Sequence, residues 1–304
     1  MKRPIVYVII VLLVTAFALL SLISWKEYQK PNMQSISHVS NNEPMKGASL
    51  SATVSLIPTL TPLFTPTPSI LPPLFPGEGG IDVPVLLYHY ISENPYKEDK
   101  VRSGLSTPPR VLDDQLKTLK SQGYSTITLD ELGAFFDKKQ LLPSKPLILT
   151  FDDGYVDFYT YAFPILTKYA MKGIAFLPTG LIGGGAYMTW KQVEEVGRSP
   201  FVAIGAHSVH HYALNKLNEE SLTFEVTESK RVLEGHLGYP INWMAYPYGT
   251  FDERVARAAQ AAGYIGSATT LPGVMQYKSR FLYLPRYRAG ARSGVELVKF
   301  LEAK

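Results

Sequence analysis

Residues capable of metal binding and proton transfer gather at two points of the sequence. The stretch "PLILTFDDGYVDF" sets Asp152 and Asp153 side by side after an apolar run, and "HSVHH" places His207, His210 and His211 after another. Alone, Asp-Asp-Gly is typical of a tight turn, and "HSVHH" is typical of a solvated loop. Together they match the ligand types of a catalytic metal site, in which two histidines and one carboxylate leave a position for water.

The chemistry that such a cluster predicts is hydrolysis at a carbonyl group. A divalent metal lowers the pKa of its water towards ~7, and a neighbouring carboxylate that is not a ligand takes the proton during attack. The two adjacent aspartates can divide these roles. His207 and His211 project to one side if the chain takes a helical turn, and His207 with His210 is the geometric alternative. The sequence has no cysteine, which excludes thiolate nucleophiles and Cys-ligated zinc.

The elements that must position these residues begin near residue 81, where short apolar runs alternate with helical patterns. This alternation predicts an α/β fold with a parallel sheet covered by helices. Strands are expected over 83–88, 124–128, 146–151, 174–178, 201–207, 242–247 and 264–268. After a long loop to residue 109, helices are expected over 110–123, 128–136, 159–173, 189–197, 219–237 and 252–263. Capping boxes are expected at Thr128/Glu131 and Thr189/Gln192.

The pattern alone does not separate an open doubly wound sheet from a closed β/α barrel. Both architectures collect their sites at the carboxyl ends of the strands. The aspartate pair and the histidine cluster follow two of the expected strands, and "YPYG" (246–249) and His89 follow two others. We therefore expect all of these residues at one end of the sheet.

The first 80 residues predict an anchor and a spacer. Segment 5–25 carries no charge, and its roughly 20 residues at 1.5 Å each cover about 30 Å, which predicts a transmembrane helix. It lacks a clear cleavage site, so we expect an uncleaved anchor with the following domain outside the cytoplasm. Residues 26–80 are rich in Pro and Thr and predict a disordered linker. Residues 81–304 form the expected catalytic domain.

Composition excludes some partners. The net charge is only +4 and charged residues make up 18% of the chain, so no nucleic-acid partner is expected. The sequence carries no phosphate loop or dinucleotide fingerprint, so no nucleotide cofactor is expected.

Three motifs carry a family resemblance. "LTFDDGY" (149–155), "GAHSVHHYAL" (205–214) and "AYPYG" (245–249) resemble the leading motifs of the polysaccharide deacetylases, also called carbohydrate esterase family 4 or the NodB-homology domain, with the core motifs within 145–290. The "VPVLLYHYI" stretch and the predicted anchor look most like the membrane-anchored bacterial poly-N-acetylglucosamine deacetylases.

The resemblance implies a distorted (β/α)7 barrel and metal-dependent removal of N-acetyl groups from an extracellular amino-sugar polysaccharide. Poly-N-acetylglucosamine, peptidoglycan and chitin-like polymers are the substrates it suggests. The implied cofactor is one divalent metal ion, with zinc expected and cobalt, nickel or manganese as alternatives.

The resemblance also assigns roles by position. Asp152 would be the general base, and Asp153, His207 and His211 would be the metal ligands. The main-chain N–H of Tyr248 would stabilise the oxyanion.

Further residues are expected to support the site. Ser208 would steady the histidine loop, and Pro247 and Gly249 would shape the turn that carries Tyr248. Residues expected to bind substrate at the rim are Tyr88, Tyr246 and Pro247. Tyr155 also lies near the expected rim, whereas Trp190 is expected in the core, and His236 is expected to have a structural role at a helix C-terminus.

The sequence departs from the family pattern at two places. Ala245 stands where the family usually has an arginine that orients the base, and we expect Arg286 in "YLPRYRAG" to take that role. No histidine follows His236, so His89 or a water on the metal is the candidate proton donor. These departures keep open the alternative of a surface pseudoenzyme that only binds glycan. An O-deacetylase of xylan-like glycans is a second alternative, because the same site could perform that reaction.

Overall fold

The computed structural model describes residues 79–96 and 98–304. The chain divides into units 1–63 and 64–304, and the fold below is that of the described part of the second unit. The predicted anchor over 5–25 and all but the end of the predicted linker over 26–80 lie outside the described residues. Within the described residues, no helix has the length and apolar character needed to cross a bilayer.

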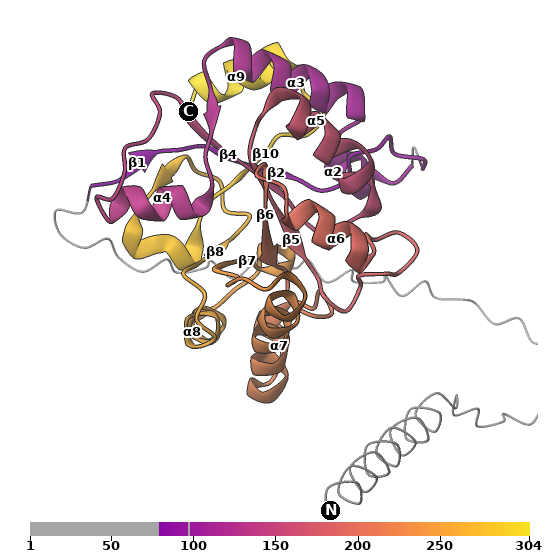
Figure 1. Cartoon of the computed structure of the whole chain (residues 1–304), viewed down its shortest axis with the longest axis vertical. Helices are drawn as coiled ribbons and strands as arrows, with labels where there is room; N and C mark the ends of the chain where they lie inside the picture. The colour runs from indigo at the N-terminus through magenta and orange to yellow at the C-terminus, as the bar shows by residue number, and fades with distance from the viewer. Residues whose placement is uncertain (1–78, 97) are drawn as a thin grey trace, which may run out of the picture. The chain divides into compact units, whose positions relative to one another are not determined.

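The centre of the domain is a parallel sheet in the order β10-β2-β4-β5-β6-β7-β8, with β3 paired to β4 (Figure 1). Its strands are β2 (Val85–Tyr88), β3 (Ser125–Thr126), β4 (Pro146–Phe151), β5 (Gly173–Leu177), β6 (Val202–Ala206), β7 (Trp243–Ala245), β8 (Gly266–Ala268) and β10 (Tyr287–Arg288). A separate antiparallel pair joins β1 (Ile81–Asp82) to β9 (Met275–Gln276). The predicted parallel α/β sheet is confirmed.

A short extended segment, residues 284–288, contacts both edges of this sheet. Leu284 forms a parallel bridge with Ala268 at the end of β8. Three residues later, Tyr287 pairs in parallel with Leu86 of β2. The sheet is therefore curled, and its arrangement is consistent with a distorted (β/α)7 barrel.

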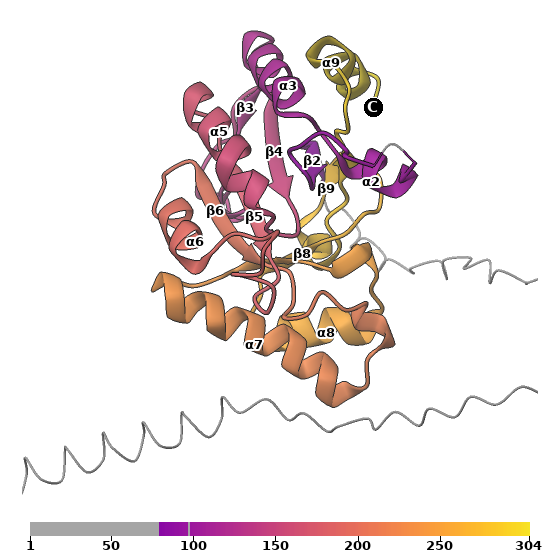
Figure 2. The same ribbon diagram turned by 90° about the vertical axis from the view of Figure 1, so that its right-hand side faces the viewer.

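The helices lie outside the sheet (Figures 1 and 2). They are α2 (Lys100–Leu105), α3 (Pro109–Ser121), α4 (Leu129–Phe136), α5 (Phe163–Tyr169), α6 (Trp190–Gly197), α7 (Glu219–Leu237), α8 (Glu253–Ala261) and α9 (Gly294–Glu302). Single turns of other helix types are η1 (Phe158–Ala162), η2 (Leu214–Lys216) and η3 (Pro247–Gly249), and η4 (Lys278–Tyr283) is longer. Helix α3 packs against α5 and α9, and α7 packs against α8. Both predicted capping boxes, at Thr128/Glu131 and Thr189/Gln192, are confirmed.

Two element predictions were wrong in detail. The helix expected over 159–173 is a π-helical turn, η1, followed by α5, which ends at Tyr169 because Ala170 is left-handed at φ 51°. Pro164 follows directly on η1 inside a continuous helical segment, where a proline cannot donate a helical hydrogen bond, and the wider π-helical turn lies immediately before it. The loop expected before residue 109 contains α2.

Alternation along the strands separates two cores. In β4, Leu149 and Phe151 join the cluster packed under the outer helices, whereas Ile148 joins a second cluster inside the curl. Because successive strand residues face opposite sides, Thr150 and Asp152 continue the inner face. By the same alternation, the first residue after several other strands also faces the inside of the curled sheet.

Candidate active site

The predicted site residues follow four strands, β2, β4, β6 and β7, at one end of the sheet. Asp152 continues β4, and its N–H donates to the carbonyl of Tyr88 at 2.9 Å. His207 continues β6 in the same way, with its N–H donating to the Leu177 carbonyl at 2.9 Å. Because the carboxyl ends of parallel strands meet at one edge, residues far apart in sequence converge there.

Asp153, His207 and His211 form a compact cluster of possible metal ligands. One Asp153 carboxylate oxygen lies 3.4 Å from His207 Nε2 and 3.1 Å from His211 Nε2. One ligand atom from each residue falls within 4.8 Å of the others. His207 Nδ1 lies 2.7 Å from the Ala245 carbonyl, which requires the Nδ1–H tautomer and leaves Nε2 free to coordinate. Two imidazoles and one carboxylate therefore fit a divalent metal of the zinc type.

The alternative ligand pair containing His210 does not fit this arrangement. His210 Nδ1 lies 2.6 Å from an oxygen of Glu225, a buried carboxylate on α7. The ring also stacks on Tyr212, with centroids 5.4 Å apart. His211, by contrast, lies beside His207 with ring centroids 4.8 Å apart.

The backbone around the cluster is strained. Among the described residues, six that are not glycine have positive φ, and four of them belong to the site: Asp153 at 76°, Ser208 at 62°, His211 at 60° and Tyr248 at 60°. Such conformations cost of order 1–3 kcal/mol each and persist only where surrounding contacts hold them. One such contact is the hydroxyl of Ser208, which accepts the N–H of His211 at 3.0 Å.

Glycine is required in the turn that carries Tyr248. Gly249 has φ 69°, and a Cβ there would lie 2.1 Å from the Thr270 hydroxyl oxygen. Any side chain at this position would displace the turn, and with it Tyr248.

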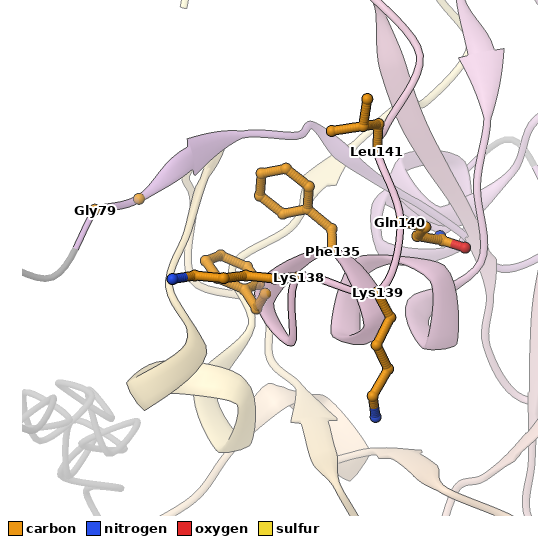
Figure 3. Close-up of a pocket in the computed structure, with 8 residues that line it drawn as sticks. Gly79, Phe135, Lys138, Lys139, Gln140 and Leu141 are labelled. Atoms are coloured by element: carbon orange, nitrogen blue, oxygen red, sulfur yellow. The ribbon is translucent and has the colours of Figure 1, made fainter.

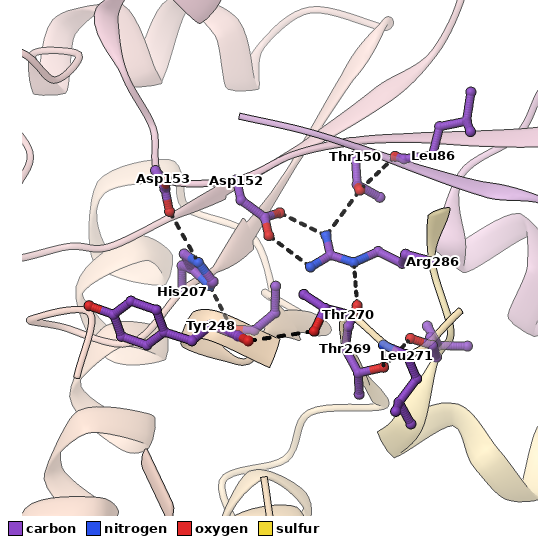
Figure 4. A network of polar contacts seen from close by, with 12 residues as sticks. Leu86, Thr150, Asp152, Asp153, His207, Tyr248, Thr269, Thr270, Leu271 and Arg286 are labelled. Carbon is purple, nitrogen blue, oxygen red and sulfur yellow. Dashed lines mark hydrogen bonds and ion pairs between the residues drawn. The ribbon is translucent and has the colours of Figure 1, made fainter. Parts of the chain in front are cut away.

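Asp152 is held by a buried arginine from the segment that contacts both sheet edges. Arg286 donates to the two carboxylate oxygens of Asp152 at 2.8 and 2.7 Å. Its remaining donors reach the Thr150 hydroxyl at 3.0 Å and the Thr269 carbonyl at 2.8 Å (Figure 4). A bidentate pair of this kind fixes both the position and the plane of a carboxylate.

Electrostatics keep both carboxylates ionised. Burial alone would raise the pKa of Asp152, but the charge and hydrogen bonds of Arg286 outweigh burial and place it below its usual range. For Asp153, burial is likewise outweighed by hydrogen bonds from His207 and His211, which lower its pKa. The pKa of His207 is raised because its hydrogen bond to Asp153 outweighs the effect of burial.

Several known proteins are similar to this chain. Residues 139–266 match the family model of polysaccharide deacetylases. Over these residues the chain is similar to the polysaccharide deacetylases. A Streptococcus pyogenes deacetylase, PplD, solved in complex with acetate, is similar with a TM-score of 0.68 and 29% identity, covering 73% of this chain and 99% of that one.

Two curated relatives differ in how much of their length is matched. The YxkH protein of Bacillus subtilis, a candidate polysaccharide deacetylase, is 29% identical over 222 residues, which cover 73% of this chain and 76% of that one. The poly-β-1,6-N-acetyl-D-glucosamine N-deacetylase of Escherichia coli is 30% identical over 127 residues, covering 36% of this chain. The matched part is only 19% of the length of the Escherichia coli enzyme.

His89 directly follows β2 on the inner side of the curled sheet. Burial lowers the pKa of its imidazole, the charges of Asp152 and Asp153 oppose this, and the charges of Arg286 and Arg288 add to the lowering. The net direction is downward, so the ring is neutral near pH 7. His89 can therefore protonate a leaving group only after it has received a proton in the same turnover.

Two tyrosines that were expected to bind substrate are core residues instead. Tyr88 is 1% exposed, stacks on Phe151 with centroids 5.0 Å apart, and donates its hydroxyl to Gln115 at 3.0 Å. Tyr246 is fully buried beneath the outer helices. Strand alternation explains both errors, because Tyr88 and Tyr246 face the helices while their neighbours face the site. Pro247 is also buried.

Two other aromatic residues, Tyr248 and Trp190, take different positions. Tyr248 is exposed and lies edge-on to His211, with centroids 4.7 Å apart. Trp190 is half-buried and stacks flat on His236 at 3.7 Å, so this pair joins two helices away from the triad.

Sequence reasoning missed Glu225 and two of three stacked tyrosines. Glu225 accepts the N–H groups of Val209 and His210 at 2.8 and 2.9 Å and so clamps the histidine loop onto α7. A charged residue on the buried face of a helix was the available signal. Tyr155, which had been placed near the rim, stacks between Tyr90 and Tyr187.

A surface pocket lies away from this chemistry. It is lined by Gly79 and by residues 135–141 around the end of α4, among them Phe135, Lys138 and Leu141 (Figure 3). This stretch leads into the start of β4, whereas the aspartates follow its end. The pocket therefore opens at the opposite end of the sheet from the site.

Proposed function

We propose that this deacetylase removes N-acetyl groups from a polymer of N-acetylglucosamine, using one divalent metal ion. The observation that carries the proposal is the arrangement of Asp152 and Asp153. One carboxylate is fixed by Arg286, and its neighbour lies within ligand distance of two histidines. These different contacts support a role for Asp152 as general base. They support Asp153, His207 and His211 as metal ligands.

The metal would be held by Asp153 and the Nε2 atoms of His207 and His211. When bound, it supplies Lewis-acid chemistry, polarising the acetyl carbonyl and making water more acidic. Zinc suits this ligand set, and cobalt, nickel or manganese are alternatives.

The residues of the chain perform the remaining steps. Asp152 accepts the proton of a water as its oxygen attacks the acetyl carbon, and Arg286 keeps the accepting oxygens in place. The main-chain N–H of Tyr248 donates to the developing oxyanion, a contribution commonly worth ~3–4 kcal/mol. As the C–N bond breaks, the sugar nitrogen takes a proton, with His89 as the candidate relay from Asp152. The products are acetate and a free amine.

Two features support the amino-sugar substrate. The Escherichia coli relative acts on poly-β-1,6-N-acetyl-D-glucosamine. The cluster and the exposed Tyr248 stand together at one open end of the sheet, where a polymer has access. We propose β-1,6-linked N-acetylglucosamine as the first substrate to test, with peptidoglycan and chitin-like chains next.

The alternative of a glycan-binding pseudoenzyme rested on the missing arginine at position 245 and the missing late histidine. The Arg286–Asp152 pair removes the first of these supports. O-deacetylation of xylan-like glycans stays an alternative, because the same site chemistry serves an ester.

The location of the enzyme is also a proposal. We propose an extracytoplasmic catalytic domain tethered by segment 5–25, supported by the charge-free apolar run and the basic residues before it. Recovery of the full chain in the membrane fraction, with the domain sensitive to externally added protease, is the expected result.

The test of function is acetate release by the metal-loaded full chain. We expect release from β-1,6-linked N-acetylglucosamine oligomers, loss of release after chelation, and recovery on adding back zinc or cobalt. The His207→Ala variant should take up no stoichiometric metal. Activity on acetylxylan alone would favour the alternative, and failure of the intact protein to bind any divalent metal would refute the mechanism.

A further inference from the structure

Three tyrosine rings form a stack beside Asp153. Tyr90 and Tyr155 stack with centroids 3.9 Å apart, and Tyr155 and Tyr187 with centroids 5.2 Å apart. The guanidinium of Arg102 covers the outer face of Tyr90, 3.0 Å from the ring centroid. Among residues 79–96 and 98–304, neither a ring nor a cation stacks on the outer face of Tyr187. The stack thus ends at Tyr187, a half-buried ring whose outer face carries no stacked ring or cation in this part of the chain.

The position of Tyr187 is fixed by the same loop that carries the aspartates. Tyr155 and Tyr187 form an antiparallel bridge. On either side of it, the Val156 N–H donates to the Ala186 carbonyl at 2.9 Å, and the Met188 N–H donates to the Gly154 carbonyl at 3.0 Å. Gly154 directly follows Asp153, so backbone hydrogen bonds connect the segment that carries the Tyr187 ring to the cluster of possible metal ligands.

The other end of the stack is also held. The Tyr90 hydroxyl donates to the Tyr155 hydroxyl at 2.5 Å. Arg102, which lies over Tyr90, donates to Ser92 at 3.0 Å, and Ser92 donates to Asp157 at 2.8 Å. The rings on which Tyr187 stacks are therefore already held in place before a ligand binds.

Tyr187 and Tyr248 both lie near the cluster of possible metal ligands. Tyr187 adjoins Asp153 through the Tyr155 loop, and Tyr248 lies against His211. Burial raises the pKa of Tyr187, and the charge of Asp153 adds to that, which places its hydroxyl within electrostatic reach of the cluster. A sugar whose acetyl group reached the cluster would therefore have its neighbour in the chain close to one of these rings.

We propose that the outer face of Tyr187 is a binding subsite for the pyranose ring next to the sugar being deacetylated. The proposal rests on the proposed function, because it assumes a glycan polymer at the metal cluster. The C–H face of a pyranose is apolar and flat enough to cover an aromatic ring, and a ring fixed in advance binds with little loss of side-chain entropy. The site would thus favour polymers over single sugars.

The experiment compares kcat/KM for acetate release from N-acetylglucosamine and its β-1,6-linked oligomers up to the hexamer, using the metal-loaded full chain. We expect kcat/KM to rise with length in the native protein. Tyr187→Ala should lower kcat/KM for the hexamer by roughly threefold to tenfold, and for the monosaccharide by clearly less. Tyr187→Phe keeps the ring face and should retain most of the length dependence.

The matched control is Tyr161→Ala, which removes an exposed tyrosine from η1, away from the stack. It should leave the length dependence as in the native protein. An equal loss at every length in Tyr187→Ala, or no loss at any length, would overturn the subsite while leaving the proposed function standing.

A second measurement separates the two proposals. If the native protein releases no acetate from any oligomer, the proposed function fails, and the subsite is then judged by calorimetric binding of the hexamer. Weaker binding by Tyr187→Ala than by Tyr187→Phe supports it. Equal affinity for the hexamer in both variants overturns it.

Discussion

Asp152 and Asp153 are neighbours in sequence, yet their surroundings are opposites. Asp152 is buried against Arg286, a partner 134 residues away in the chain. Asp153 faces two histidines on a loop whose conformation depends on left-handed residues and on Glu225. The first support is a long-range ion pair inside the curled sheet, and the second is a local loop clamped from outside. Proton transfer and metal binding should therefore fail separately when one support is removed.

The largest difference between the effect on catalysis and the effect on metal binding is expected from Asp152→Asn. The amide cannot accept the proton of water, and general bases commonly contribute 10²–10⁴-fold, so kcat should fall by about that factor. Metal content should stay near that of the native protein, because Asp152 is not in the ligand cluster. Acetate release and metal stoichiometry measured on one sample check this. Loss of metal with loss of activity would show that the two supports are not separate.

Arg286→Lys tests the support of Asp152. A lysine keeps the charge but not the bidentate geometry, and misplacement of a reacting group can cost up to ~10²-fold, so we expect kcat to fall roughly tenfold to hundredfold with a smaller change in KM.

The pH profile distinguishes positioning from general damage. Arg286 lowers the pKa of Asp152, so weakening the pair raises that pKa and protonates the base at higher pH. The acid limb of kcat should then move to higher pH in Arg286→Lys. A uniform fall at every pH would argue against this role.

Glu225→Gln tests the support of the histidine loop. The carboxylate accepts two backbone N–H groups and pairs with His210. Weakening such an outer contact typically costs 10–100-fold in metal affinity. Titration with a competing chelator measures this, and saturating metal should restore most of the activity. The control is Glu220→Gln at an exposed position of the same helix, which should match the native protein.

The smallest effect is expected from Tyr88→Phe. Its hydroxyl donates to Gln115 in the core, so the variant should lose about 1 kcal/mol of the free energy of unfolding. Its kcat/KM should stay within about twofold of the native value. A larger fall in kcat/KM with an unchanged free energy of unfolding would indicate that Tyr88 does contact the substrate.

The sequence predicted the ligand cluster because its members lie within short motifs directly after strands. The rule that strand ends converge brought Asp153 and the histidine loop together, and the family resemblance selected His211 rather than His210 as the partner of His207. Arg286 was placed by a similar argument, since it follows a late apolar segment.

The remaining features depend on packing between distant parts of the chain. Glu225 acts from a helix on the far side of the histidine loop, and Tyr187 reaches the site through a bridge to Tyr155. A charged residue on a buried helix face was a local signal for Glu225, but no local pattern identifies the partner that either residue contacts. Tyr88 and Tyr246 were different, because strict alternation along their strands already pointed them towards the helices.

The segment over 284–288 links closure of the sheet to the position of Asp152. This segment holds the two sheet edges and also delivers the arginine that holds the base. The orientation of the Asp152 carboxylate therefore depends on closure of the sheet by its last strand in the sequence, so a change that loosens this closure would also release Asp152.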